Sequence, residues 1–310
     1  MFRLANQWRG VEFRHLEVLQ AIAARGSFWG ASEVLDCSPS AVSQQLATLE
    51  RLVRHRLVER SPGRRQVRLT DAGRVLVRHA DAVVARLRAA EADFAALDSG
   101  ASGPLRVGTY QSVGTKILPR LLREFGGERP GVEVRLTEGA GDEGLLQMVE
   151  RGELDLTFTG LPLPDGPFEA VRLMEDPCVL VVPRDARVDS PPSAEQWAAL
   201  NLIGFCRGRV VTAAEDQVRR LGVDPRIVFR TEDNGTMQRL VAAGFGAALA
   251  PLLTVDETDG AVRVVELDGF PSRLLGLAWH RDRYRSAAVA AFVERARHIC
   301  AGLETPRAPA

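Results

Sequence analysis

The sequence predicts an α/β protein in two parts: an N-terminal winged helix-turn-helix with a long linker helix, followed by a two-lobed α/β domain. Three observations predict this fold. The chain has 310 residues, about twice the usual size of one domain. Apolar residues recur mainly at helical spacing up to about residue 98, and from residue 105 short apolar runs alternate with amphipathic segments.

Three helices are expected in the first 53 residues. Apolar residues at helical spacing and the breaker Gly26 predict a first helix of about 12 residues before Ser27. Ser27 can cap a short second helix that ends at Leu35, and Ser38-Pro39 supplies an N-cap and a first-turn proline for a third. This order is typical of a helix-turn-helix, whose last helix enters the major groove of DNA.

The third helix is expected to bury Val42, Leu46, Leu49 and Val53 and to leave its polar side in water. The polar groups of that side, together with the cap, are the candidates for contact with DNA bases: Ser38, Ser40, Ser43, Gln44 and Arg51.

A basic hairpin is expected next, with strands at 57–60 and 66–69. Between Arg51 and Arg68 there are seven arginines and one acidic residue, and residues 1–98 carry 15 arginines against 11 acidic residues. Such a charge suits a polyanion, so we expect Arg64, Arg65 and Arg68 of this wing to contact phosphates. The alternative is a small helical core with a solvated arginine loop.

A long helix is expected from Thr70 to about Leu97, because this stretch has no proline and carries an apolar stripe. A helix of about 40 Å on so small a domain cannot bury its stripe locally. We therefore expect Val83, Leu87 and Phe94 to pair with a second copy of the chain. Packing against the chain's own C-terminal domain is the alternative.

Residues 99–104 are small and lack periodicity, which predicts a hinge. Two series of alternating strands and helices follow, which predict two α/β lobes with parallel crossovers. The expected strands are 105–110, 132–137, 154–159, 178–183, 202–205, 227–230, 247–250 and 274–280, and the expected helices are 112–125, 142–151, 213–221, 235–243 and 286–303.

Ligands of open α/β sheets bind at the carboxyl ends of strands, where helix N-termini favour an anion. In this sequence the rule selects the loops at 110–112, 139–141, 159–160, 205–207 and 233–236. We therefore expect a small molecule with an anionic group to bind between the lobes.

The N-terminal part resembles the LysR-type transcriptional regulator family over about 60 positions. The resemblance is carried by these runs: Phe13-Arg14-His15-Leu16, Gly26-Ser27-Phe28, Ala31-Ser32-Glu33-Val34-Leu35, Ser38-Pro39-Ser40-Ala41-Val42-Ser43-Gln44-Gln45-Leu46, Leu49-Glu50, Leu57-Val58-Glu59-Arg60 and Leu69-Thr70-Asp71-Ala72-Gly73. Pro39-Ser40 and Gln44 depart from the family pattern, which affects the expected base preference.

The resemblance implies a DNA-binding transcriptional regulator. Its linker helices would dimerise on a dyad-symmetric operator in double-stranded DNA, and its C-terminal domain would resemble periplasmic binding proteins and hold an effector between the lobes. A homodimer or homotetramer and contact with RNA polymerase are the expected associations. The positions that match effector contacts of the family are Gln111, Ser112, Thr159, Phe205, Arg207, Asn234 and Thr236. Each also has an ordinary interpretation, as an N-cap, a loop polar group, a core residue or a surface arginine.

The expected organisation is a winged helix-turn-helix at 1–69, a linker helix at 70–98, a hinge at 99–104, an effector domain at 105–303 and a tail at 304–310. Within the effector domain, lobe I is expected at about 105–175 and 268–303, and lobe II at about 176–267.

No catalytic, cofactor-binding or metal-binding motif is found, so we expect no enzyme activity, no cofactor and no metal. The four cysteines are far apart, and a redox switch between Cys178 and Cys206 is the remaining role considered for them. No apolar run could span a membrane and no export signal is seen, which favours a cytoplasmic location over a secreted solute-binding protein. An α/β enzyme fused to a winged helix is the other alternative.

Overall fold

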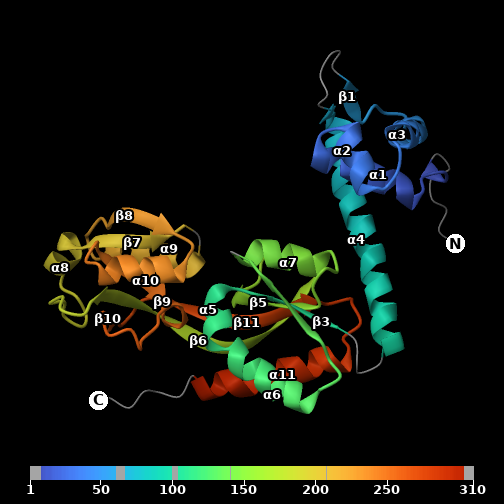
Figure 1. The fold of residues 1–310 in the computed structure, drawn as a ribbon. Coiled ribbons are helices and arrows are strands. Elements are labelled where there is room, and N and C mark those ends of the chain that lie inside the picture. The colour runs from blue at the N-terminus through green and yellow to red at the C-terminus, as the bar shows by residue number, and fades with distance from the viewer. Residues whose placement is uncertain (1–7, 61–66, 100–103, 140, 207, 304–310) are drawn as a thin grey trace. The chain divides into compact units, whose positions relative to one another are not determined.

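The structure is a computed structural model that describes residues 8–60, 67–99, 104–139, 141–206 and 208–303 (Figure 1). The chain divides into two compact units, residues 1–92 and 93–310, and each is described separately. Within the described ranges no helix combines the length and the apolar character needed to cross a bilayer.

The first unit contains the three predicted helices, α1 (Phe13–Arg25), α2 (Phe28–Val34) and α3 (Pro39–Val53). Gly26 ends α1 in the left-handed conformation, with φ of 63°, which glycine adopts without strain. The hydroxyl oxygens of Ser27 and Ser38 accept hydrogen bonds from the backbone N–H groups of Gly30 and Ala41, so both predicted N-caps are confirmed. The buried face of α3 is the predicted one: Val42, Leu46, Leu49 and Val53.

The hairpin consists of β1 (Val58–Arg60) and β2 (Val67–Leu69), paired antiparallel. Two contacts hold it against the helices. The N–H of Leu57 donates to Glu50 Oε1 of α3 at 2.7 Å, and the N–H of Val67 donates to the carbonyl of Gly26 at 2.8 Å. The tip of the predicted wing lies outside the described residues.

The long helix α4 (Asp71–Ser99) begins one residue after Thr70, whose hydroxyl accepts a hydrogen bond from the N–H of Gly73 at 3.0 Å. One side of α4 packs on the first unit through Leu76, Ala80 and Val84. The other side exposes large apolar residues: Val75, Val83, Leu87 and Phe94. The predicted stripe therefore splits into a buried part and an exposed part.

The second unit is built on a nine-stranded mixed sheet in the order β4-β3-β5-β11-β6-β9-β7-β8, with β10 paired to β6. Its strands are β3 (Leu105–Thr109), β4 (Val134–Glu138), β5 (Leu156–Leu161), β6 (Phe168–Pro183), β7 (Asn201–Phe205), β8 (Arg226–Thr231), β9 (Ala247–Pro251), β10 (Val262–Glu266) and β11 (Ser272–His280). Its helices are α5 (Gln111–Lys116), α6 (Leu118–Glu128), α7 (Asp142–Glu150), α8 (Ala194–Ala199), α9 (Arg209–Arg220), α10 (Asn234–Ala242), the short 3-10 helix η2 (Leu252–Thr254) and α11 (Ala287–Leu303).

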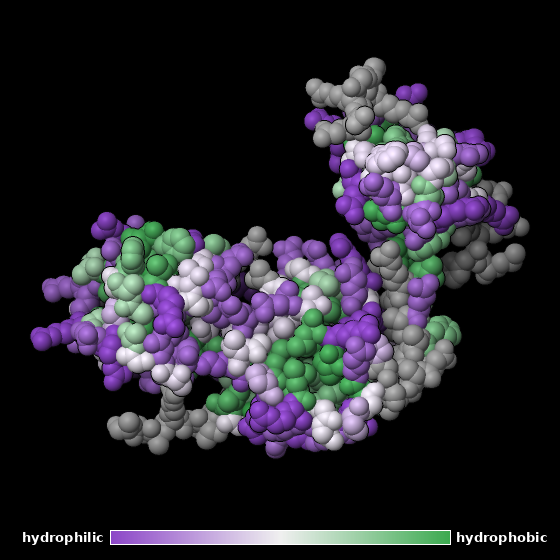
Figure 2. All heavy atoms as spheres, in the orientation of Figure 1, coloured by the Kyte–Doolittle hydropathy of each residue, from purple (hydrophilic) through white to green (hydrophobic). Residues whose placement is uncertain are grey.

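The strand β6 connects two lobes. Its first half pairs with β11, and its second half pairs with β9 and β10. We call β3, β4, β5, β11 and the first half of β6, with α5, α6, α7 and α11, lobe I, and the remaining strands with α8, α9 and α10, lobe II. Each lobe has its own apolar core. On the face drawn in Figure 2, hydrophobic residues gather between α6 and α7 of lobe I, and the helices of the first unit show mainly hydrophilic residues.

Two predictions about the second unit were wrong. The helix expected at 112–125 is two helices, α5 and α6, because Pro119 has no N–H to continue the hydrogen bonding of α5. The strand expected at 178–183 begins ten residues earlier, at Phe168. Its first half alternates buried and exposed residues and includes Glu169, Glu175 and Asp176, so it lacks the apolar run on which the prediction depended.

Candidate functional sites

The polar side of α3 is presented to solvent as the sequence predicted. Ser40, Gln44 and Arg51 are exposed and Ser43 is half-buried. The hydroxyl of Ser38, besides capping the helix, lies 2.9 Å from that of Ser40. These groups therefore form one polar surface from the first turn of α3 to its last, opposite the buried side.

The candidate phosphate contacts of the wing are placed only in part. Arg68 lies in the middle of β2, opposite Glu59, and is exposed. Arg64 and Arg65 lie outside the described residues.

Polar side chains join the two lobes at the start of α5 and α10. Gln111, the first residue of α5, donates from Nε2 to Asp233 Oδ2 at 2.9 Å and accepts at Oε1 from the N–H of Asn234 at 2.8 Å. Asp233 is the N-cap of α10 and also accepts from the N–H of Thr236 at 2.5 Å. The hydrogen bonds to Gln111 and to Thr236 lower the pKa of Asp233, so its carboxylate stays ionised at neutral pH.

A second bridge joins the lobes at the start of α9. The guanidinium of Arg209 donates to the carbonyls of Gly160 and Pro162 at 2.7 and 2.8 Å. Its Nη2 lies 3.9 Å from Oδ2 of Asp142, the first residue of α7. The other carboxylate oxygen of Asp142, Oδ1, accepts from the hydroxyl of Tyr110 and from the N–H of Gly160, both at 3.1 Å.

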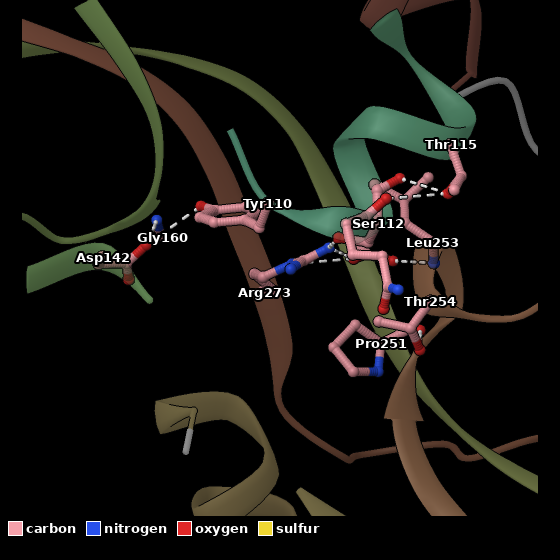
Figure 3. A network of polar contacts seen from close by, with 11 residues as sticks. Tyr110, Ser112, Thr115, Asp142, Gly160, Pro251, Leu253, Thr254 and Arg273 are labelled. Atoms are coloured by element: carbon pink, nitrogen blue, oxygen red, sulfur yellow. Dashed lines mark hydrogen bonds and ion pairs between the residues drawn. The ribbon is translucent and has the colours of Figure 1, made fainter. Parts of the chain in front are cut away.

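Tyr110 is the residue that carries this network back into lobe I (Figure 3). Its ring lies beside the guanidinium of Arg273, 5.6 Å from ring centre to Cζ. Burial, and next the negative charge of Asp142, raise the pKa of Tyr110 well above its usual value of 10. The phenol therefore stays protonated and donates its hydrogen to Asp142.

A buried ion pair lies where β6 passes between the lobes. Arg273 Nη2 donates to Asp176 Oδ2 at 2.6 Å and to the hydroxyl of Ser112 at 3.1 Å, and Asp176 Oδ1 accepts from the N–H of Leu253 at 2.9 Å. Burial raises the pKa of Asp176, and the positive charge of Arg273 opposes that shift. Figure 3 shows Ser112 and Arg273 pointing toward one another from α5 and β11.

The remaining predicted effector contacts do not join this network through free side chains. Thr159 is fully buried in β5, and its hydroxyl donates to the carbonyl of Gly160 at 3.5 Å. Phe205 packs against the core of lobe II. The expectation that the backbone N–H of Thr236 is free for an anion was wrong, because Asp233 already occupies it. Arg207 lies outside the described residues.

Sequence reasoning selected most of the right loops but missed several of the residues in them. Four helices begin at the inter-lobe contacts, and their first residues are Gln111, Asp142, Arg209 and Asn234. The sequence prediction included Gln111 and Asn234. It omitted Asp142, which directly follows a selected loop, and Arg209, because α9 was expected to begin at Ala213.

The two cysteines considered for a redox switch are not close enough to pair. Cys178 lies opposite Pro251 on β9, and the β7–β9 register places Cys206, just beyond β7, at the same level one strand further. Two strand spacings amount to about 10 Å, beyond the range of about 4.4–6.8 Å between Cα atoms of a disulfide. Burial also raises the pKa of Cys178 to about 12. In the described part of the chain no group of histidine, cysteine or acidic residues has the arrangement of a metal site.

Comparison with known families gives two matches that together cover most of the chain. Residues 13–74 match the family described as bacterial regulatory helix-turn-helix protein, lysR family, and residues 98–301 match the LysR substrate binding domain.

Individual relatives and structures match over nearly the whole length. An uncharacterised HTH-type transcriptional regulator, YcgK, of Bacillus subtilis is 28% identical over 93% of this chain and 94% of its own. The RuBisCO operon transcriptional regulator of Allochromatium vinosum is 29% identical over 92% and 95%. The crystal structure of full-length OxyR from Pseudomonas aeruginosa aligns with a TM-score of 0.67 at 22% identity, covering 97% of this chain and 100% of that one, which shows a shared fold.

Proposed function

Because this chain belongs to the LysR family of bacterial transcriptional regulators, we propose that its α3 and wing read an operator, that α4 joins two copies, and that an effector binds between the lobes. The chain is a DNA-binding regulator with an effector-binding domain, and not an enzyme. The proposals below concern the residues and partners that carry out this activity.

For DNA, we assign base contacts to Ser40, Ser43, Gln44 and Arg51, with Ser38 as a cap that also faces the duplex. Arg68, together with Arg64 and Arg65, is assigned to phosphates. The observation that carries this assignment is the polar, exposed side of α3 opposite its buried face. Arginine and glutamine side chains recognise base edges in the major groove, whereas arginines on a wing neutralise phosphates.

The functional regions are proposed as 1–69 for DNA binding, 70–98 for dimerisation, 99–104 as a hinge and 105–303 for effector binding, with a tail at 304–310. For dimerisation, Val83, Leu87 and Phe94 are 52%, 44% and 68% exposed on one side of α4. Water contact at such large side chains is unfavourable, and a second α4 would remove it. A homodimer, or a homotetramer of two such dimers, is the proposed assembly on a dyad-symmetric site. RNA polymerase is the further partner proposed for a regulator acting at promoters.

For the effector, the observation that carries the proposal is that polar side chains of both lobes meet at the first turns of α5, α7, α9 and α10. A small molecule at these contacts touches both lobes, so it favours one relative position of the lobes over others. We propose that it carries an anionic group, because Arg209 of lobe II and Arg273 of lobe I both reach this region. Gln111, Ser112 and Asn234 are the other proposed contacts, and Thr159, Phe205, Arg207 and Thr236 are retained as residues around the site.

Selection of bound fragments from a genomic DNA library with the full-length protein tests the DNA assignment. We expect enrichment of a dyad-symmetric sequence, and we expect Gln44→Ala to alter the enriched bases. Arg220→Ala, an exposed change on α9, is the matched control and should leave them unchanged. An unaltered motif with Gln44→Ala would remove α3 from the base-reading role.

A further inference from the structure

The contacts between the lobes bring together one carboxylate and one guanidinium that do not satisfy each other. Asp142 Oδ2 of lobe I and Arg209 Nη2 of lobe II lie 3.9 Å apart, and their side chains are 33% and 58% exposed. This separation is too long for a hydrogen bond. The two groups are therefore near neighbours of opposite charge that face each other without a direct bond.

Both groups are held in place by their other atoms. Asp142 is fixed through Oδ1, which accepts from Tyr110 and from Gly160. Arg209 is fixed by its donations to the carbonyls of Gly160 and Pro162. Oδ2 of Asp142 is left able to accept hydrogen bonds, and the guanidinium retains N–H groups beyond the two that these carbonyls use. Each charge is thus positioned by the protein while part of its hydrogen-bonding capacity stays unused.

The space between the two groups is kept open by the absence of a side chain at Gly160. A Cβ atom at this position would lie 3.1 Å from Asp142 Oδ2 and 3.7 Å from Arg209 Nη2. The φ of Gly160 is not in the positive range, so the backbone does not require glycine here. The requirement that the structure does show is spatial: a side chain would enter the space between the charges.

The surrounding ionisable groups already have partners. Arg273 pairs with Asp176, and Asp233 accepts from Gln111 and Thr236. Tyr110 is protonated and donates to Asp142. The charges that remain for a ligand are one negative and one positive, with a sum of zero.

We propose that this site binds a zwitterion, a small molecule that carries an ammonium group and a carboxylate on neighbouring atoms, as an α-amino acid does. The proposal rests on the proposed effector function and names the ligand class. The ammonium group donates to Asp142 Oδ2, and the carboxylate accepts from the guanidinium of Arg209. The close spacing of the two protein charges matches the close spacing of the two charges on one α-carbon.

The same geometry discriminates between ligand classes. A carboxylate without a neighbouring ammonium group would gain the contact with Arg209 but would lie beside the negative charge of Asp142. An amine without a carboxylate would meet the opposite problem beside Arg209. A zwitterion makes both charge-assisted hydrogen bonds, and losing one of them costs about tenfold or more in affinity.

Thermal-shift measurements followed by calorimetry on the full-length protein test the ligand class. The probes are the common α-amino acids, each compared with its N-acetyl derivative, which lacks the ammonium charge, and with its methyl ester, which lacks the carboxylate. We expect at least one free amino acid to raise the Tm and to bind, and we expect both of its derivatives to bind at least about tenfold more weakly.

Two variants test the site. Asp142→Asn retains an oxygen to accept from Tyr110 and Gly160 but removes the charge, so it should weaken the free amino acid about tenfold and strengthen binding of its N-acetyl derivative. Gly160→Ala should weaken all ligands by filling the space. Asp165→Asn, an exposed carboxylate of the same lobe, is the matched control and should bind as the wild type does.

Three outcomes overturn the proposal. Equal affinity for a free amino acid and its N-acetyl derivative, or unchanged affinity in Asp142→Asn, shows that Asp142 does not select the ligand. Binding of N-acetyl derivatives alone overturns the zwitterion and leaves the anionic effector in place. Binding of neither class overturns both effector proposals, whereas the DNA assignment depends separately on the fragment selection.

Discussion

Single residues at the first turns of helices make the contacts between the lobes. Parallel strands end at the same edge of a sheet, so the helices that follow them begin at that edge. This topology explains why Gln111, Asp142, Arg209 and Asn234 meet although they are distant in sequence. In the DNA-binding part, single residues are arranged differently, because one helix carries all the proposed base contacts.

Removing a wing arginine should weaken binding to all DNA sequences. Arg68→Ala loses one proposed phosphate contact, so the slope of log affinity against log salt concentration should fall by about 0.9. Arg64→Ala and Arg65→Ala should act in the same way. Fluorescence anisotropy with operator and unrelated duplexes over a range of salt concentrations measures both quantities, with Arg220→Ala as the control. An unchanged slope in all three variants would exclude the wing from the interface.

Tyr110 should make the protein less stable at alkaline pH. Its pKa in the folded state is raised above 10 by burial and by Asp142. The unfolded chain therefore loses this proton first, and the stability that the protonated phenol contributes is present below pH 10 and is lost as the pH rises above that value. The free energy of unfolding should fall above about pH 10, less steeply in Tyr110→Phe.

The chain has two tyrosines, Tyr110 and Tyr284, which makes this prediction measurable. In Tyr284→Phe, the ultraviolet absorbance of the phenolate reports Tyr110 alone. We expect it to appear well above the ordinary tyrosine pKa of about 10, or together with unfolding. A phenolate signal with an ordinary pKa in the folded protein would contradict the hydrogen bond to Asp142.

Secondary-structure elements were predictable where local signals agree with the tertiary fold. Ser27, Gly26 and the Ser38-Pro39 pair defined the helix-turn-helix because caps and breakers act through neighbouring backbone atoms. The first half of β6 and the strand β10 were missed because pairing with distant strands, and not an apolar run, gives them their conformation. For the same reason, sequence could indicate the loops of the inter-lobe site but not the partners of Asp142 and Arg273.

The exposed side of α4 should hold the dimer together. Leu87→Asp places a charge on the exposed stripe, and burying one leucine stabilises by roughly 1.5 to 3 kcal/mol. Because a dimer contains this position twice, the variant should dissociate and lose affinity for a two-half-site operator. Analytical ultracentrifugation measures the assembly. Arg86→Glu, a neighbouring exposed position on α4, is the control and should remain dimeric, whereas an unchanged oligomer in Leu87→Asp would show that the stripe is not the seam.

At the level of the whole molecule, the family assignment joins two units that physical reasoning treats separately. The first unit presents a polar helix face, and the second holds two lobes together by polar side chains that a ligand can also bind. A change in the position of the lobes affects DNA only if it alters how two copies are held, because each copy binds one half-site. Dimerisation through α4 is therefore the step on which the proposed regulation depends.

Footprinting of the full-length protein on the DNA fragment that it enriches tests this account most directly. We predict two protected half-sites on one face of the duplex, related by a dyad and separated by one or more helical turns of DNA. The wild-type protein and the Arg86→Glu control should protect both half-sites at the same concentration, and Leu87→Asp should lose this joint protection. A single protected half-site with the wild-type protein, or full protection by Leu87→Asp, would contradict the proposed α4-linked dimer on its operator.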